Sequence, residues 1–160
     1  MPRGSWLDGR INITRHDTGP VRVVGHGIIS GRRFSYKGGR VQDYIRSVEV
    51  QYDRPLLWDG PMLADPKGHA LFVPPHSVVH DLKVLGWLYN EDGVWLTTNT
   101  TLQNAFVRTN DDSIRFAAGV FDGFPAPGCH GCPAPVRGMP AWGIRVENAV
   151  VHQLFSTYFR

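Results

Sequence analysis

The sequence contains little cysteine, no long apolar run and no charge imbalance, and each absence excludes a class of protein. Two cysteines among 160 residues, Cys129 and Cys132, are too few for a disulfide-stabilised scaffold. No run approaches the roughly 18 consecutive apolar residues of a membrane span, and the first residues lead into no apolar segment typical of a secretory signal. We therefore expect no membrane partner and no signal peptide in this chain.

Strong charge of one sign and helical periodicity are also missing. The formal net charge is +3, from 17 basic against 14 acidic residues, so we do not expect nucleic acid as a partner. No stretch repeats apolar residues at the spacing of a helix face for three turns. Because the chain also contains 18 glycines and 12 prolines, it does not fit a coiled coil or a long-helix bundle.

The sequence has instead many short runs of Val, Ile, Leu, Phe and Tyr, each bounded by Gly, Pro, Asn or Asp. Such runs are typical of strands, and we predict an all-β chain. The expected strands are residues 9–13, 21–24, 27–30, 44–52, 70–73, 78–84, 93–96, 101–107, 113–116 and 143–155.

Two weak internal repeats decide between all-β architectures. Residues 79–84, 102–107 and 146–151 match at offsets of 23 and 44, each with Asp or Asn in third place, and residues 90–94 match 110–114 at an offset of 20. Coils of this length, with an Asx side chain stacked at a fixed corner, predict a right-handed parallel β-helix. The alternative is an antiparallel β-sandwich, which also has many short strands.

We expect residues 1–160 to form a single domain. The chain ends in an apolar stretch and offers no cap at either end of a solenoid, so we interpret it as part of a longer catalytic domain. Residues 121–141, rich in proline and glycine, are predicted to be an excursion loop between coils. For Cys129 and Cys132 inside it, a local disulfide, a zinc site and free thiols all stay open.

The second repeat brings acidic residues together. It places Asp92 and Asp112 on successive coils, roughly 4.8 Å apart, and adds Asp111 and Glu91 beside them. Like charges at this range raise at least one pKa, and an acid held protonated beside an ionised carboxylate is what glycoside hydrolysis requires. The competing interpretation is a solvated turn capped by Asp side chains. Asp111 and Asp112 cannot both face a substrate from a regular strand, so we expect a bulge or strand end there.

These residues resemble a known family. The segment Asn90-Glu91-Asp92-Gly93 resembles the Asn-Thr-Asp-Gly motif of polygalacturonases, and Asn110-Asp111-Asp112 resembles their Gly-Asp-Asp. The closer resemblance is to the dextranase and isopullulanase family of glycoside hydrolases, and it extends to residues 25–31, 87–90 and 146–153. It implies the pectin lyase-like β-helix, a polysaccharide partner, no cofactor and no metal, and an extracellular location.

The resemblance also implies roles for residues. Asp111 would be the general acid, and Asp92 with Asp112 would activate water, which inverts the anomeric carbon of an α-glucan such as dextran. Glu91 departs from the usual Thr, and Arg115 stands where a Lys is expected. The candidate substrate-binding residues are Asn90, Trp95, Asn110, Arg115, His152 and Gln153.

Several alternatives stay open at this point. Trp95 is either a platform for a sugar ring or an interior aromatic residue. A non-catalytic or truncated β-helix, acting as a carbohydrate-binding or adhesin-type module, is the main alternative function, and a polygalacturonase-like pectin hydrolase is the second. The acidic surroundings of Asp92 favour a neutral glucan over a polyuronate. The sequence indicates neither the linkage cleaved, nor endo or exo action, nor the oligomeric state.

Overall fold

The computed structural model describes residues 1–13, 19–35, 46–50, 54–88, 91–116 and 142–153. All regular elements of these residues are short strands. In chain order they are β1 (Trp6–Asp8), β2 (Ile11–Ile13), β3 (Val21–Val24), β4 (Ile28–Ser30), β5 (Val48–Val50), β6 (Leu56–Asp59), β7 (Met62–Ala64), β8 (Leu71–Val73), β9 (Val78–His80), β10 (Lys83–Leu85), β11 (Val94–Leu96), β12 (Thr101–Gln103), β13 (Phe106–Thr109), β14 (Ile114–Phe116), β15 (Arg145–Glu147) and β16 (Val150–Gln153).

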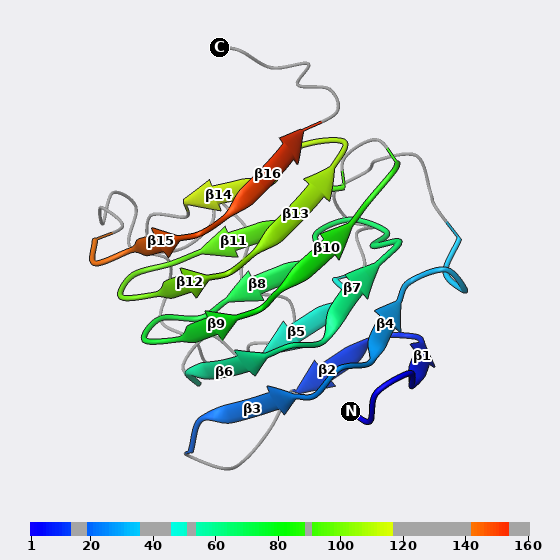
Figure 1. The fold of residues 1–160 in the computed structure, drawn as a ribbon, viewed down its shortest axis with the longest axis horizontal. Helices are drawn as coiled ribbons and strands as arrows, with labels where there is room; N and C mark the ends of the chain where they lie inside the picture. The colour runs from blue at the N-terminus through cyan, green and yellow to red at the C-terminus, as the bar shows by residue number, and fades with distance from the viewer. Residues whose placement is uncertain (14–18, 36–45, 51–53, 89–90, 117–141, 154–160) are drawn as a thin grey trace, which may run out of the picture.

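The strands form three parallel sheets that wrap around one interior. The sheet orders are β1-β4-β7-β10-β13-β16, β14-β11-β8-β5-β2 and β15-β12-β9-β6-β3. Each coil contributes one strand to each sheet, and the coils stack from the blue N-terminal end to the red C-terminal end (Figure 1). The protein is a right-handed parallel β-helix, as predicted. Every pair of described strands is parallel, which excludes the antiparallel sandwich.

The first sequence repeat corresponds to the strand register. Leu102 pairs with Val79 on one side and with Val146 on the other, as the alignment of the three segments requires. The residues in third place, Asp81, Asn104 and Asn148, take φ angles of 52°, 53° and 50°. Asn and Asp tolerate this left-handed conformation better than other side chains, and the chain turns there from one sheet to the next.

This corner corrects three predicted strands. The segments 78–84, 101–107 and 143–155, each expected to be one strand, are divided into β9 and β10, β12 and β13, and β15 and β16. The left-handed residue ends the first strand of each pair, so the second belongs to another sheet. Asn148 Nδ2 donates to Asn104 Oδ1 at 3.3 Å, which forms the expected Asx stack at the corner.

Three strands were not predicted. They are β1, β6 and β7, and the latter two are joined by Gly60, with a φ of 93°, and Pro61. The sequence around Gly60 reads as a turn, which concealed the two short strands on either side of it. Two such strands per corner are the regular arrangement of this solenoid.

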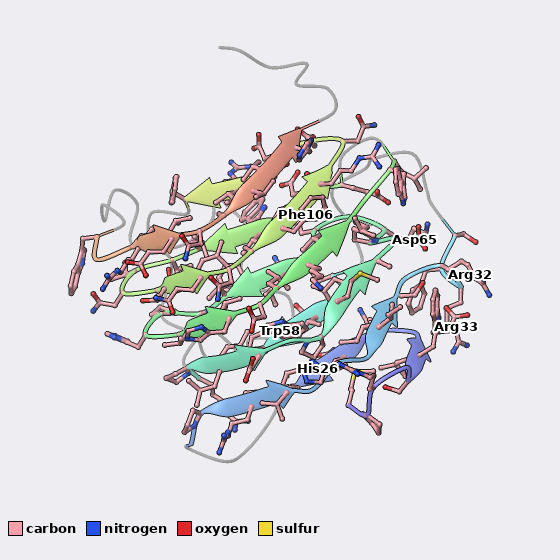
Figure 2. The ribbon with its side chains drawn as sticks, in the orientation of Figure 1. His26, Arg32, Arg33, Trp58, Asp65 and Phe106 are labelled. Atoms are coloured by element: carbon pink, nitrogen blue, oxygen red, sulfur yellow. The ribbon has the colours of Figure 1, made fainter. Side chains whose placement is uncertain are left out.

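Alternate side chains of each strand fill the interior. Ile29, Leu63, Val84 and Val107 follow one another along one sheet, each with an exposed fraction of 0%. Trp58 of β6, at 1% exposed, is the largest fully buried side chain among the described residues (Figure 2). Each fully buried Leu, Ile or Val contributes about 1.5–3 kcal/mol. This stack fixes the coil register, and the register fixes which side chains meet on the outer face.

Candidate active site

The acidic residues lie at one corner of the solenoid, where each coil enters the sheet of β8, β11 and β14. Val94 pairs with Leu71 and with Ile114. The Gly93 amide donates to the Asp112 carbonyl at 2.8 Å, and Val94 donates to the Ser113 carbonyl at 3.0 Å. The expected equivalence of Asp92 and Asp112 on successive coils is therefore confirmed.

Gly93 is required for this close approach. A Cβ atom at Gly93 would collide with the Ser113 carbonyl and with the Val107 side chain. The glycine of the Asn-Glu-Asp-Gly segment therefore lets two coils meet at full strand pairing directly beside Asp92.

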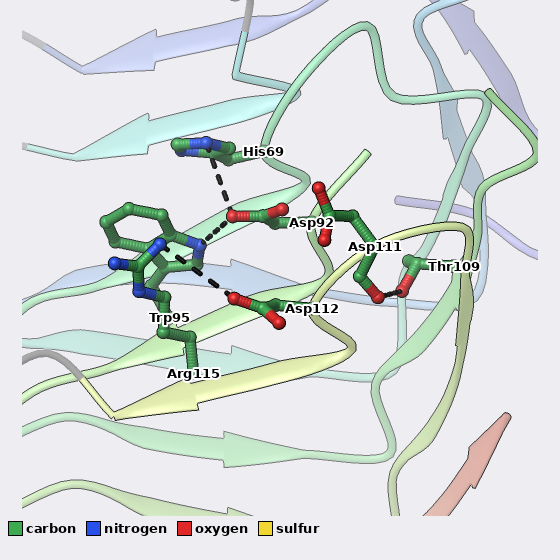
Figure 3. Close-up of polar contacts among 7 residues, drawn as sticks. All are labelled: His69, Asp92, Trp95, Thr109, Asp111, Asp112 and Arg115. Atoms are coloured by element: carbon green, nitrogen blue, oxygen red, sulfur yellow. Dashed lines mark hydrogen bonds and ion pairs between the residues drawn. The ribbon is translucent and has the colours of Figure 1, made fainter. Parts of the chain in front are cut away.

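Asp111 and Asp112 lie between strands, which removes the objection that neighbouring strand residues face opposite ways. Residues 110–113 form the bend between β13 and β14. Buried Thr109 holds this bend, because its Oγ1 donates to the Asp111 carbonyl at 3.2 Å and lies 2.8 Å from Ser113 Oγ. The expected strand end is present, and the side chains of both aspartates gather beside Asp92 (Figure 3).

Asp92 is the most enclosed of the three aspartates, with a side chain that is 8% exposed. Its Oδ2 accepts a 2.8 Å hydrogen bond from Trp95 Nε1 and lies 3.4 Å from His69 Nε2. Burial, together with the nearby Asp111 and Asp112 carboxyls, raises the pKa of Asp92 to about 7 against the opposing Trp95 N–H. A buried carboxyl that titrates near neutral pH is typical of acid–base sites.

The two carboxyls on the following coil have different surroundings. Burial and the neighbouring Asp112 raise the pKa of Asp111 above its ordinary value. Asp112 Oδ2 lies 3.9 Å from Arg115 Nη1, and the two side chains are about equally exposed, at 47% and 44%. The carboxyls of the cluster therefore differ in burial and in their charged neighbours, and such differences in environment allow one group to donate a proton while another accepts one.

Trp95 does not provide the open platform considered from the sequence. The residue is 6% exposed. The His69 ring stacks on it at 4.3 Å between centroids, and the Arg115 guanidinium lies 4.3 Å from its centroid. The interior-type alternative for Trp95 fits this structure better, and its polar atom holds Asp92.

Glu91 also differs from expectation, because its side chain serves the turn and not the carboxyl cluster. It is fully buried, and Oε2 accepts hydrogen bonds from the amides of Trp87 and Leu88. Its other oxygen is buried and has no hydrogen-bond partner among the described residues. Burial raises the pKa of Glu91 to about 7. This residue shapes the turn that leads into Asp92.

Three further candidate substrate-binding residues, Asn110, His152 and Gln153, lie on the coil of Asp111 or on the next one. Asn110 begins the bend and donates from Nδ2 to the Trp87 carbonyl at 3.5 Å. His152, exposed on β16, pairs in register with Arg108, and its ring is 5.7 Å from that of Phe106. Gln153 pairs with Thr109, so β16 ends one coil beyond the bend that carries Asp111.

Two groups of predicted residues lie outside the described part of the chain. They are Asn90, and the loop with Cys129 and Cys132. Among the residues that the structure does describe, no three His, Cys, Asp or Glu side chains are grouped to hold a metal ion. No helix in the same residues is long and apolar enough to cross a membrane.

His69 is the site residue that sequence reasoning missed. It stands one coil before Asp92, on the same row of the sheet, because Leu71 pairs with Val94. The signal was available, since His69 and Asp92 are separated by 23 residues, the offset of the first repeat. Extending that offset backward from Asp92 identifies His69.

Comparison with known proteins finds similarity to dextranases. The chain is 22% identical over 134 residues to the dextranase of Arthrobacter sp. (strain CB-8), and equally to that of Arthrobacter globiformis. The match covers 70% of this chain and 21% of each relative, so the chain spans about a fifth of the length of the curated relatives it matches. No protein-family model and no solved structure matches it.

Proposed function

We propose that this chain carries the catalytic centre of an inverting glycoside hydrolase that acts on an α-glucan such as dextran. The observation that carries the proposal is the cluster of Asp92, Asp111 and Asp112 at one corner, with unequal burial and with the pKa values of Asp92 and Asp111 both raised. The similarity to two dextranases agrees with the same chemistry. An extracellular location belongs to the proposal on the ground of the sequence resemblance alone.

Asp111 is assigned as the general acid. Burial and the neighbouring Asp112 raise the pKa of Asp111, which favours its protonated form relative to a free carboxyl, and that proton passes to the glycosidic oxygen as the bond from this oxygen to the anomeric carbon breaks. Asp92 and Asp112 are assigned to the water. One of them takes a proton from the water as its oxygen bonds to the anomeric carbon from the opposite face, which inverts that carbon.

The surroundings of the cluster favour a neutral glucan. A polyuronate would bring further carboxylates against Asp92, Asp111 and Asp112, at a cost in Coulomb energy. Arg115 and Asn110, beside the cluster, supply N–H donors suited to sugar hydroxyls. His152 and Gln153 extend the proposed substrate contacts along the next coil.

Sugar release tests the proposal directly. The purified chain is incubated with dextran, pullulan and polygalacturonate, beside Asp111→Asn and a matched control, Asp59→Asn, on an exposed position of another sheet. We expect release from dextran, a loss of about a hundredfold or more in Asp111→Asn, and no change in the control. Proton NMR of the first product reports inversion. Binding of dextran without turnover by folded wild-type chain supports the carbohydrate-binding module instead, and release from polygalacturonate alone supports the pectin hydrolase.

A further inference from the structure

The row of residues that contains Asp92 and Asp112 continues one coil earlier to a histidine. His69 lies directly before Asp92 in this row, and its side chain is 12% exposed. Its Nε2 is 3.4 Å from Asp92 Oδ2, and its ring stacks on Trp95 (Figure 3). Buried beside the Asp92 carboxyl, the His69 ring either only packs there or also affects the chemistry of that carboxyl.

The hydrogen bond that Asp92 already accepts indicates which partner donates in the contact between His69 and Asp92. Asp92 Oδ2 already accepts the Trp95 N–H, so this oxygen presents lone pairs and not a proton. A second group at the same oxygen is therefore best matched by an N–H from His69 Nε2. Two N–H donors on one oxygen favour the ionised carboxylate.

The imidazole supplies this donor without a charge. Burial, together with the positive charges of Arg46, on the preceding coil, and Arg115, on β14, lowers the pKa of His69 to about 3. The charged groups facing Asp92 itself are Asp111, Asp112 and Arg115. His69 is thus neutral near pH 7. It acts on Asp92 through the dipole of its N–H group and by holding the carboxyl in one orientation.

We propose that His69 is a positioning residue for Asp92, whose imidazole donates from Nε2 to Asp92 Oδ2 and, together with Trp95, holds that oxygen so that Oδ1 receives the proton of the attacking water. This inference rests on the proposed function only for the transfer of the water proton to Oδ1. The hydrogen bond, the tautomer and the effect on the carboxyl can be measured whether or not the chain cleaves sugar.

Two substitutions separate the donor from the ring. His69→Phe keeps an aromatic ring against Trp95 and removes the N–H, whereas His69→Gln keeps an N–H and removes the ring. His80→Gln, on the outer face of another sheet, is the control. Carboxyl carbon NMR, with the Asp92 signal assigned from Asp92→Asn, follows the titration of Asp92 in each variant.

A raised Asp92 midpoint in His69→Phe, a midpoint near the wild-type value in His69→Gln and no change in the control are the expected results. In turnover, kcat of His69→Phe falls about tenfold with KM nearly unchanged, and its acid limb moves to higher pH. An unchanged Asp92 midpoint in folded His69→Phe overturns the proposal. No sugar release by the wild type overturns the proposed function and leaves the titration result intact.

Nitrogen NMR of the wild-type imidazole provides a test without substitution. We expect the His69 ring to carry its proton on Nε2 and to stay neutral from about pH 5 to pH 8. A proton on Nδ1 alone, or titration of the ring within this range, contradicts the proposed donor even if the Phe variant fails to fold.

Discussion

The indole N–H of Trp95 reaches back three residues to Asp92 Oδ2 at 2.8 Å. Trp95 is the middle residue of β11, and its indole lies beside the Asp92 carboxyl (Figure 3). The bond links a buried aromatic residue of the outer face to the most buried carboxyl of the cluster. Because both partners are nearly inaccessible to water, the bond contributes more than a surface hydrogen bond would.

Trp95→Phe removes this donor and keeps an aromatic ring. The N–H opposes the rise in the pKa of Asp92, so its loss raises that pKa above about 7. A base that ionises later is less active in acid, and we expect kcat/KM near pH 6 to fall about ten- to hundredfold. The pH profile of dextran hydrolysis measures the effect, with the exposed Trp142→Phe as control. An unchanged acid limb in a folded variant would contradict the prediction.

Glu91→Gln makes stability less dependent on pH. Burial raises the pKa of Glu91 from 4.5 to about 7, so the folded state binds this proton more tightly than the unfolded state. The resulting stabilisation is complete below about pH 4.5 and is lost as the pH rises through about 7. Relative to the variant, the wild type should lose about 1–2 kcal/mol between these limits. Urea unfolding at both pH values measures it, and parallel behaviour of the two proteins would sink the idea.

Arg115→Lys separates the charge of Arg115 from its planar shape. The positive charge lowers the pKa values of Asp92 and Asp111, and the guanidinium plane covers the Trp95 ring. Lysine keeps the charge, so we expect the pH profile to stay near that of the wild type. Arg115→Ala should shift the acid limb upward and raise the fluorescence response of Trp95 to quenchers. Equal profiles for the Lys and Ala variants would show that the charge does not act on the carboxyls.

Asn104→Ala tests the left-handed corner. The residue has a φ of 53° and accepts a hydrogen bond from Asn148. A residue with an ordinary Cβ costs about 1–2 kcal/mol in this conformation, whereas glycine adopts it freely. We expect Asn104→Ala to lower the free energy of unfolding by about 1–2 kcal/mol more than Asn104→Gly. Equal losses would assign the role of Asn104 to the side-chain bond alone.

Leu102→Ala tests the interior stack. Leu102 is 0% exposed at the centre of β12, between Val79 and Val146. Removing its isobutyl group should cost about 2–5 kcal/mol, because the neighbouring coils cannot collapse into the space without losing register. Denaturant unfolding measures the loss, and Val146→Ala, at 38% exposure, should change stability by much less. A loss below about 1 kcal/mol would indicate that this coil is not packed as described.

Repetition made the solenoid predictable. The offsets between Asp81, Asn104 and Asn148 correspond to paired strands, and the offset between Asp92 and Asp112 does as well. The Asx corner was predicted, but its division of one strand into two was not, because a single Asn or Asp at positive φ leaves no pattern beyond its own type. Strands of three residues on either side of such a corner therefore appeared as one longer strand.

Side-chain direction near the cluster was the harder part. Glu91 is adjacent to Asp92 in sequence, yet its carboxyl turns inward to the amides of Trp87 and Leu88. Because Glu91 is acidic, the sequence predicted an additional charge in the site. Its carboxyl instead lies where the backbone N–H groups of the turn need an acceptor. Trp95 was placed near Asp92 correctly, but its burial depends on His69 and Arg115 from two other coils.

The stacked row also affects how such a chain tolerates length changes during evolution. The coil from His69 to Asp92 takes 23 residues and the next, to Asp112, takes 20, yet the three residues fall in one row. Hydrogen bonding between neighbouring strands, and not the number of residues in between, sets their separation. Insertions or deletions at the outer turns can therefore accumulate without moving the carboxyl groups. A single residue added between Asp92 and Val94, in contrast, would break the row.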